Sequence, residues 1–337
     1  MPQNGRCTRL FVIGGSAGAI EAVRELLNLL PRGFPCPILV VIHTPVDSAG
    51  SLSAVLQRDS KLIVQSATDG TAIRGGHVYI APPNYHMTVR DSRVRLLTGP
   101  VENRHRPSID PLFHSAAQQF GPAAVGVVLS GYLDDGSNGL WNIKKAGGVA
   151  IAQSPEDAIV PDMPRTAADR VEPHHVVSIR HLAPLMIELA ADPIAPLRAT
   201  ETASMAPGNE KIGTPSVFTC PECHGSLWEV DEGGTLRFRC RVGHSFTADT
   251  MLEDQSLDVE RALWAALRVL EENSELSMRL ASKAKQMGRV RAHKRYSERV
   301  EESRRNAAVL RELLTKGVRQ EPKPARTLGE ADEQATA

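Results

Sequence analysis

The first 190 residues alternate short apolar runs with amphipathic stretches. Several runs, such as 38–42, are apolar at every position, which is typical of strands covered on both faces of a parallel sheet. The alternation predicts a doubly wound α/β domain with a mainly parallel sheet and helices on both faces. The section around 61–97 is irregular and could be antiparallel. The predicted strands are 10–13, 38–42, 61–65, 77–80, 94–97, 124–130, 149–152 and 176–178. The predicted helices are 19–30, 51–59, 111–120, 136–146, 163–170 and 181–191.

The composition changes after this α/β domain, which we place at 1–191. Residues 192–215 are rich in Pro, Ala, Thr, Glu, Gly and Ser and predict a linker. Residues 216–247 predict a small module rich in Cys, Gly and Arg. Residues 248–317 are almost free of Gly and Pro and predict one or two long helices with a break at Gly288. The polar residues 318–337 predict a disordered tail.

Length and charge exclude several classes of protein. The chain has 337 residues and a formal net charge of zero, which argues against binding of nucleic acid or anionic membranes by the whole chain. No apolar run reaches the roughly 20 residues needed to cross a bilayer, and the N-terminus has no signal-peptide pattern. Three of the five cysteines cluster near one histidine, which favours metal binding in a reducing compartment. We therefore expect a cytoplasmic protein, with Cys7 and Cys36 as inert core thiols.

A strand-to-helix turn, Gly14-Gly15-Ser16-Ala17-Gly18, carries the first candidate for chemistry. It places the hydroxyl of Ser16 at the carboxyl end of a strand, beside a helix N-terminus that favours negative charge. The spacing fits the nucleophile-elbow pattern. A phosphate-binding loop or a plain tight turn fits it equally well.

Two further strands end in candidate catalytic side chains. His43 directly follows the run 38–42, and Asp134 and Asp135 follow the run 124–130. Taken singly, the histidine could cap a loop and an aspartate could cap a helix. Together, the three strand ends supply a hydroxyl, a base and a carboxylate, which nucleophilic acyl transfer requires. The order Ser, His, Asp differs from that of α/β-hydrolases.

These segments resemble the catalytic blocks of CheB-type chemotaxis protein-glutamate methylesterases. The turn GGSAGA, the strand end VIHTP and the segment LSGYLDDGSNG carry the resemblance. It extends through APPNYHM at 81–87, RPSIDPLFHSAA at 106–117 and AQSPEDAIVPDMPRTA at 152–167, and covers about 8–190. The resemblance implies that Ser16 is the nucleophile, His43 the base, and Asp135, directly before a glycine, the orienting carboxylate.

The resemblance also implies the reaction and its partners. The family removes methyl groups from glutamyl methyl esters on chemoreceptors, some members deamidate receptor glutamines, and catalysis needs no cofactor. The implied partners are a methyl-accepting chemoreceptor and a chemotaxis methyltransferase or histidine kinase system. Well-known members carry a receiver domain ahead of the esterase, which we do not expect here. Ala19 and Tyr132 depart from the family pattern, so they bear on which ester is accepted.

Four residues in the family-like blocks have simpler interpretations. His86, Arg104, Arg106 and Asp110 could line the site. We favour simpler roles over direct chemistry. His86 would be a loop histidine, the two arginines would be solvated, and Asp110 would be a helix N-cap before Pro111.

The module at 216–247 carries a metal-ligand pattern. Cys220 and Cys223, followed by Cys240 and His244, give C-x₂-C…C-x₃-H, which suits a tetrahedral zinc ion. Strands at 226–230 and 236–239 around Asp-Glu-Gly-Gly predict a hairpin, so we expect a zinc-ribbon-like module with structural zinc. Arg237, Arg239 and Arg241 add positive charge, but sparse aromatic residues favour a structural or protein-contact role over nucleic-acid binding.

Two other functions remain open beside the esterase. A catalytically altered scaffold could recruit partners through the zinc module and the helices. The helices themselves could pair with a partner helix or with a second copy of the chain, or they could lie solvated on the first domain. A nucleotide-binding protein could use 14–18, but a histidine stands at residue 43, where a ribose-binding acid would be expected.

Overall fold

The computed structural model describes residues 9–44, 52–192, 213–232 and 235–316. The chain divides into two compact units, Met1–Met251 and Leu252–Ala337. Cys7, most of the predicted linker and the predicted tail lie outside the described residues.

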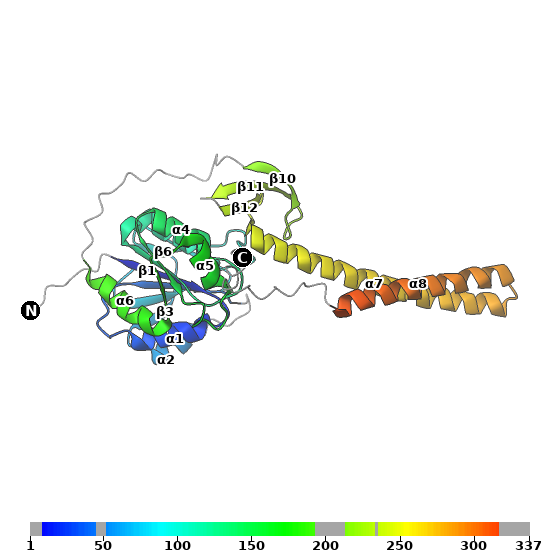
Figure 1. Cartoon of the computed structure of the whole chain (residues 1–337), viewed down its shortest axis with the longest axis horizontal. Helices are drawn as coiled ribbons and strands as arrows, with labels where there is room; N and C mark the ends of the chain where they lie inside the picture. Colours follow the sequence, from blue (N-terminus) through cyan, green and yellow to red (C-terminus); the bar gives the residue numbers. More distant parts are fainter. Residues whose placement is uncertain (1–8, 45–51, 193–212, 233–234, 317–337) are drawn as a thin grey trace, which may run out of the picture. The chain divides into compact units, whose positions relative to one another are not determined.

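A seven-stranded parallel sheet forms the centre of the first unit (Figure 1). Its order is β3-β4-β2-β1-β7-β8-β9. The strands are β1 (Leu10–Gly15), β2 (Ile38–Ile42), β3 (Ile63–Ser66), β4 (His77–Ile80), β7 (Ala124–Val128), β8 (Val149–Gln153) and β9 (His175–Val177). This confirms the predicted mainly parallel α/β fold.

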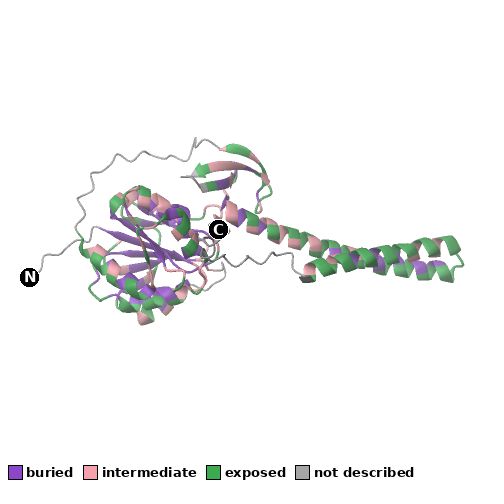
Figure 2. Cartoon of the chain, in the orientation of Figure 1, coloured by how far each residue is buried: buried purple, intermediate pink, exposed green. Residues whose placement is uncertain are grey.

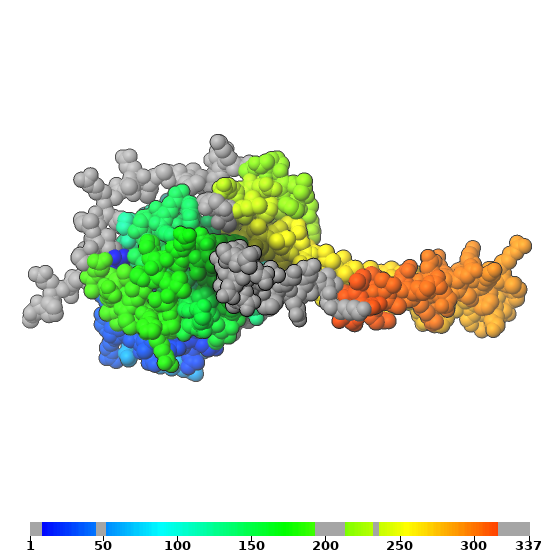
Figure 3. All heavy atoms as spheres, in the orientation of Figure 1, coloured from blue at the N-terminus to red at the C-terminus, as the bar shows by residue number. Residues whose placement is uncertain are grey.

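Helices cover both faces of the sheet. Successive side chains of each strand point to opposite faces, and because both sets are apolar, both faces must be buried. Phe11 and Ile13 of β1 pack in one apolar cluster, and Leu10 and Val12 pack in the other. The first cluster includes α1 (Ala19–Leu29), α2 (Leu52–Asp59) and α6 (Ile179–Ala191). The second includes α3 (Ile109–Phe120), α4 (Ser137–Lys145) and α5 (Asp162–Val171). A short 3₁₀ helix, Gly121–Ala123, follows α3. The side chains of these two clusters fill the space between the sheet and the helices. Figure 3 shows one face of the first unit, where the helices, green and blue, cover the sheet.

The section around 61–97 is only partly antiparallel. β3 and β4 join the parallel sheet, whereas β5 (His86–Arg90) and β6 (Arg93–Leu97) form a separate antiparallel hairpin. β5 was not predicted, because its apolar signal is only Met87 and Val89, which are buried between partly or fully exposed Thr88 and Arg90.

The sheet order reverses at β1. The chain adds β2, β4 and β3 on one side of β1, and β7, β8 and β9 on the other. In open α/β sheets, functional sites form where the order reverses, at the carboxyl ends of the strands. The carboxyl ends of β1, β2 and β7 meet at this point.

A four-stranded antiparallel sheet completes the first unit. It contains β10 (Thr214–Thr219), β11 (Ser226–Glu232), β12 (Thr235–Cys240) and β13 (Ser245–Thr247). The predicted pairing of 226–230 with 236–239 is confirmed. Leu227, Phe238 and Phe246 form its small core. We call the described residues 214–247 the Cys3His module. Cys36 of the α/β domain is disulfide-bonded, so its prediction as an inert thiol is wrong.

The second unit is a helical hairpin. α7 (Ala248–Gln286) and α8 (Val290–Lys316) are separated by Gly288, whose φ of 65° ends helical geometry, so the predicted break is confirmed. Contacts of Arg304 with Met278 and of Arg311 with Glu271 show that the helices are antiparallel. Buried residues lie where the two helices face each other (Figure 2). Among the described residues, no helix is long and apolar enough to cross a membrane.

Candidate active site

The turn after β1 holds Ser16 in a tightly packed position. The Ser16 N–H donates to Ser130 O over 2.9 Å, and α1 begins three residues later. Gly18 has a φ of 80°, and a Cβ there would lie 2.7 Å from Ser130 Oγ. A Cβ at Gly131 would lie 2.8 Å from Ser16 Cβ and 2.0 Å from Met163 Sδ. Both glycines are therefore required by the space around Ser16.

His43 follows β2 directly and lies at the strand end beside Ser16. Its N–H donates to Gly15 O over 3.1 Å, which ties the two strand ends together. His43 Nε2 lies 2.7 Å from Asp135 Oδ2. Nδ1 is buried and has no hydrogen-bond partner among the described residues. Among the described residues, no hydrogen bond joins Nδ1 to Ser16 Oγ.

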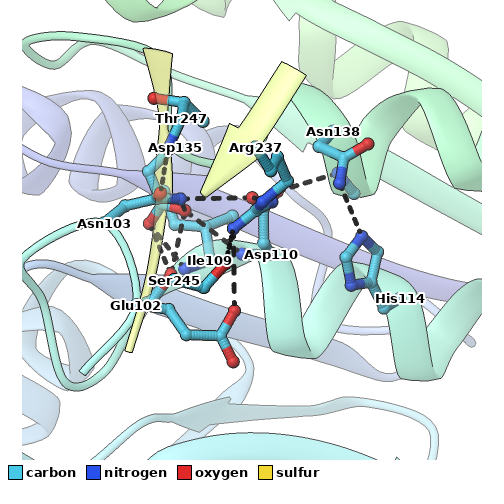
Figure 4. Close-up of polar contacts among 12 residues, drawn as sticks. Glu102, Asn103, Ile109, Asp110, His114, Asp135, Asn138, Arg237, Ser245 and Thr247 are labelled. Carbon is cyan, nitrogen blue, oxygen red and sulfur yellow. Dashed lines mark hydrogen bonds and ion pairs between the residues drawn. The ribbon is translucent and has the colours of Figure 1, made fainter. Parts of the chain in front are cut away.

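Asp135 is buried and held by several donors at the N-terminus of α3 (Figure 4). Asn103 Nδ2 donates to it over 2.8 Å, Ser108 Oγ over 2.9 Å and the Ile109 N–H over 2.7 Å. Burial alone would raise the pKa of Asp135. The hydrogen bonds and the charge of His43, together with these donors, hold the pKa below its ordinary value. Asp135 is therefore a carboxylate that orients the His43 ring.

Asp134 has a different environment from its neighbour. Its carboxylate accepts hydrogen bonds from Thr247 Oγ1 over 2.8 Å and from Arg170 Nη1 over 2.9 Å. Burial raises the pKa of Asp134 to about 6. The structure thus pairs Asp135, and not Asp134, with His43.

A second imidazole, which the sequence did not single out, lies against His43. The rings of His43 and His105 are stacked, with centroids 3.6 Å apart. Burial, and then the charge of His43, lowers the pKa of His105 to about 3. His105 is therefore neutral at physiological pH. No sequence pattern marks it, because it lies in a loop between segments of regular structure.

The other candidate residues support the loops near the site. His86 is the buried first residue of β5, so its interpretation as a loop histidine is wrong; its Nε2 lies 2.8 Å from Pro100 O. Arg106 donates to Asn84 Oδ1 and Gly99 O. Asp110 does not cap α3, because the helix begins at Ile109 after Ser108, so that part of its interpretation is wrong. Asp110 is instead fully buried and paired with Arg237. Arg237 is buried as well, so it adds nothing to a basic surface.

Three cysteines and a histidine of the Cys3His module lie together. The ligand atoms of Cys220, Cys223, Cys240 and His244 are all within 4.8 Å of one another. Cys223 Sγ lies 3.7 Å from Cys240 Sγ, and His244 Nδ1 lies 3.5 Å from Cys240 Sγ. This group could hold a metal ion.

Comparison with known proteins agrees with this arrangement. The family model for CheB methylesterase matches residues 11–186, just over half of the chain. The chain belongs to the CheB methylesterase family. The matched region contains β1, β2, β7 and the strand ends that carry Ser16, His43 and Asp135. The Cys3His module and the helical hairpin lie outside it.

Individual relatives match about half of the chain. A methylesterase/glutaminase homologue from Leptospira interrogans is 37% identical over 180 residues, which are 53% of this chain and 93% of that protein. The protein-glutamate methylesterase/protein-glutamine glutaminase of Chromohalobacter salexigens is 40% identical over 163 residues, 47% of this chain and 46% of that one. The crystal structure of the Thermotoga maritima CheB methylesterase catalytic domain matches with a TM-score of 0.52 and 31% identity, over 54% of this chain and 98% of that domain.

Proposed function

We propose that this chain is a serine hydrolase that demethylates glutamyl methyl esters on chemoreceptor-like proteins. Ser16 is the nucleophile, His43 the general base and Asp135 the orienting carboxylate. One observation carries the proposal: the buried His43–Asp135 pair lies at the strand end beside Ser16, and the other ring nitrogen has no partner among the described residues. The relatives are named for this reaction on protein glutamates.

The proton path follows from the two nitrogens of His43. Nε2 donates to the carboxylate of Asp135, which leaves Nδ1 as the acceptor for the Ser16 hydroxyl proton. Ser16 Oγ then attacks the ester carbonyl, and His43 returns the proton to the methoxide as methanol leaves. Water, deprotonated by the same ring, hydrolyses the acyl-enzyme and restores Ser16 and a free glutamate.

We expect the oxyanion donors among the residues that directly follow the nucleophile. The Ser16 N–H is engaged by Ser130 O, so it cannot serve. The N–H groups of Ala17 and Gly18 precede the first turn of α1 and have no hydrogen-bond partner among the described contacts. They lie at a helix N-terminus, where negative charge is stabilised. We assign them as the donors to the tetrahedral intermediate.

The same acyl-enzyme chemistry extends to glutamine, with ammonia leaving in place of methanol. The proposed partners are then a methyl-accepting receptor and a chemotaxis methyltransferase or histidine kinase system, in the cytoplasm. We propose the division made from the sequence, with a catalytic domain at 1–191, a linker from 192, a helical region at 248–317 and a tail at 318–337. The Cys3His module begins at Thr214 and not at 216, because β10 begins there. A scaffold without catalysis is less well supported, because the His43–Asp135 pair is intact.

Methanol release from a methylated receptor fragment tests the proposal. Purified chain is incubated with the fragment, and methanol and free glutamate are quantified against time. We expect turnover by the wild type and none above background by Ser16→Ala. Equal rates for the two proteins would refute the assignment of Ser16.

We also propose that the Cys3His module binds structural zinc through Cys220, Cys223, Cys240 and His244. Zinc–sulfur bonds of about 2.3 Å at tetrahedral angles place ligand atoms roughly 3.5–3.8 Å apart. The separations of 3.7 Å between Cys223 Sγ and Cys240 Sγ and 3.5 Å between Cys240 Sγ and His244 Nδ1 fit this spacing. The module has a core of few side chains, so bound metal would supply much of its stability.

Elemental analysis of the purified chain tests the metal assignment. One zinc per chain is expected, with less in Cys240→Ser and a lower melting temperature of the module. Another metal in its place, or none after expression with zinc, would overturn it.

A further inference from the structure

The Cys3His module contributes one charged side chain to the interior of the α/β domain. Arg237, on β12, is 2% exposed, and its Nη1 donates to Asp110 Oδ2 over 2.7 Å. Asp110 lies in the first turn of α3, and its Oδ1 accepts the N–H of Gly139 in α4 over 2.8 Å. α4 begins directly after the Asp135 turn. The ion pair thus holds both helices that flank Asp135 (Figure 4).

Asn103 connects this ion pair to the catalytic carboxylate. Its Nδ2 donates to Asp110 Oδ2 over 3.2 Å and to Asp135 Oδ1 over 2.8 Å. The module fixes Asn103 in turn: the Asn103 N–H donates to Ser245 O over 2.9 Å, and the Thr247 N–H donates to Asn103 Oδ1 over 3.3 Å. Because Oδ1 faces an N–H donor, Nδ2 must face the two carboxylates.

Arg237 also balances the charge behind the site. Glu102, Asp110 and Asp135 are carboxyl groups close to one another, and Arg237 Nη2 lies 3.8 Å from Glu102 Oε2. Burial raises the pKa of Glu102, and the charge of Arg237 opposes this rise. Without the guanidinium, Asp110 would be a buried carboxylate without its ion-pair partner, directly beside Asp135.

The residues that reach the site are adjacent in sequence to the candidate metal ligands. Arg237 precedes Cys240 by three positions on β12, and Ser245 directly follows His244. The pairing of Arg239 with Ser245 joins the two strands. Closing the four-ligand group would therefore hold the strands that carry Arg237 and Ser245.

We propose that Arg237 and Asn103 are positioning residues for the esterase, so that the Cys3His module holds Asp135 in the orientation that aligns His43. The proposal rests on the proposed function of Ser16, His43 and Asp135. Neither Arg237 nor Asn103 touches the reacting atoms. The module is then part of the machinery for proton transfer.

The test uses the full chain and two readouts. The first is kcat and KM for methyl ester hydrolysis. The second is the downfield proton resonance of the His43–Asp135 hydrogen bond, which needs no substrate and disappears in Asp135→Asn. The variants are Arg237→Gln, Arg237→Lys and Asn103→Ala. Arg241→Gln is the matched control, because Arg241 is exposed in the same module and contacts the Trp228 ring.

In Arg237→Gln we expect kcat to fall by about 10²-fold with KM within twofold, because misplacing a catalytic group slows chemistry without removing substrate contacts. The His43–Asp135 resonance should shift or broaden. Arg237→Lys should recover part of kcat, Asn103→Ala should resemble Arg237→Gln, and the control should match the wild type. Metal content and circular dichroism should be unchanged.

Wild-type kcat and an unshifted resonance in Arg237→Gln would overturn the proposal. If that variant does not fold, Asn103→Ala decides, because it retains the Arg237–Asp110 ion pair. An unchanged resonance there would equally overturn it. If the wild type releases no methanol but the His43–Asp135 resonance shifts in Arg237→Gln, the proposed substrate is wrong and the positioning role stands.

Discussion

The rings of His43 and His105 lie nearly parallel, with 3.6 Å between their centroids and 15° between their planes. The His43 ring is thus fixed by Asp135 at its edge and by His105 on one face. A neutral ring is suited to this place, because a second positive charge beside His43 would oppose protonation of the base. Burial, and then the charge of His43, lowers the pKa of His105 to about 3, which keeps this ring neutral.

His105 should make the protein sensitive to acid. Its pKa in the folded state, about 3, lies below the ordinary 6.5, so its contribution to stability is complete above pH 6.5 and is lost as the pH falls toward 3. His105→Phe keeps a stacked ring that cannot titrate. The unfolding free energy of both proteins should fall between pH 7 and pH 4. The fall should be smaller in the variant than in the wild type, by up to about 3 kcal/mol. Urea denaturation at the two pH values measures this, and equal losses would contradict it.

Asp134 should act in the opposite direction. Its pKa of about 6 lies above the ordinary 3.8, so its contribution is complete below pH 3.8 and is lost as the pH rises through 6. Asp134→Asn replaces the ionised group by a neutral isostere. At pH 7.5 the variant should be more stable than the wild type by up to about 3 kcal/mol.

Chemical denaturation at pH 3.5 provides the control for Asp134. At that pH most of the wild-type carboxyl is protonated, so the two proteins should have similar unfolding free energies. Lower stability of Asp134→Asn at pH 7.5 would show that the bonds to Thr247 and Arg170 need the charge.

Gly131 should be required for the position of the nucleophile. A methyl group there would approach Ser16 Cβ to 2.8 Å and Met163 Sδ to 2.0 Å, so the turn must shift. We expect Gly131→Ala to lower kcat by about 10²-fold. Gly33→Ala is the matched control, because nothing lies within 4 Å of the added Cβ. Steady-state kinetics of the two variants tests this, and equal activity would mean that the turn adapts.

Much of the fold could be predicted because it depends on local pattern. Apolar runs such as β2 and glycine turns such as 14–18 carry their information within a few residues. The parallel fold, the helices and the break at Gly288 followed from such patterns. β5 was missed because its two buried residues, Met87 and Val89, give too short an alternation.

The contacts around the site depend on residues far apart in sequence, which pattern cannot pair. The ion pair of Arg237 with Asp110 joins positions separated by 127 residues, and the hydrogen bond of Thr247 with Asp134 joins positions separated by 113. From the sequence, Arg237 looked like a surface charge and Asp110 like a helix cap. Only their burial together shows their relation to Asp135.

Covalent trapping of Ser16 tests its role as the activated nucleophile. The full chain is treated with a fluorophosphonate and the modified peptide is mapped by mass spectrometry. We predict one adduct, on Ser16, that forms far more slowly in His43→Gln and is absent in Ser16→Ala. A wild-type protein that is not labelled, or is labelled on another residue, would contradict the assignment of Ser16 as the activated nucleophile.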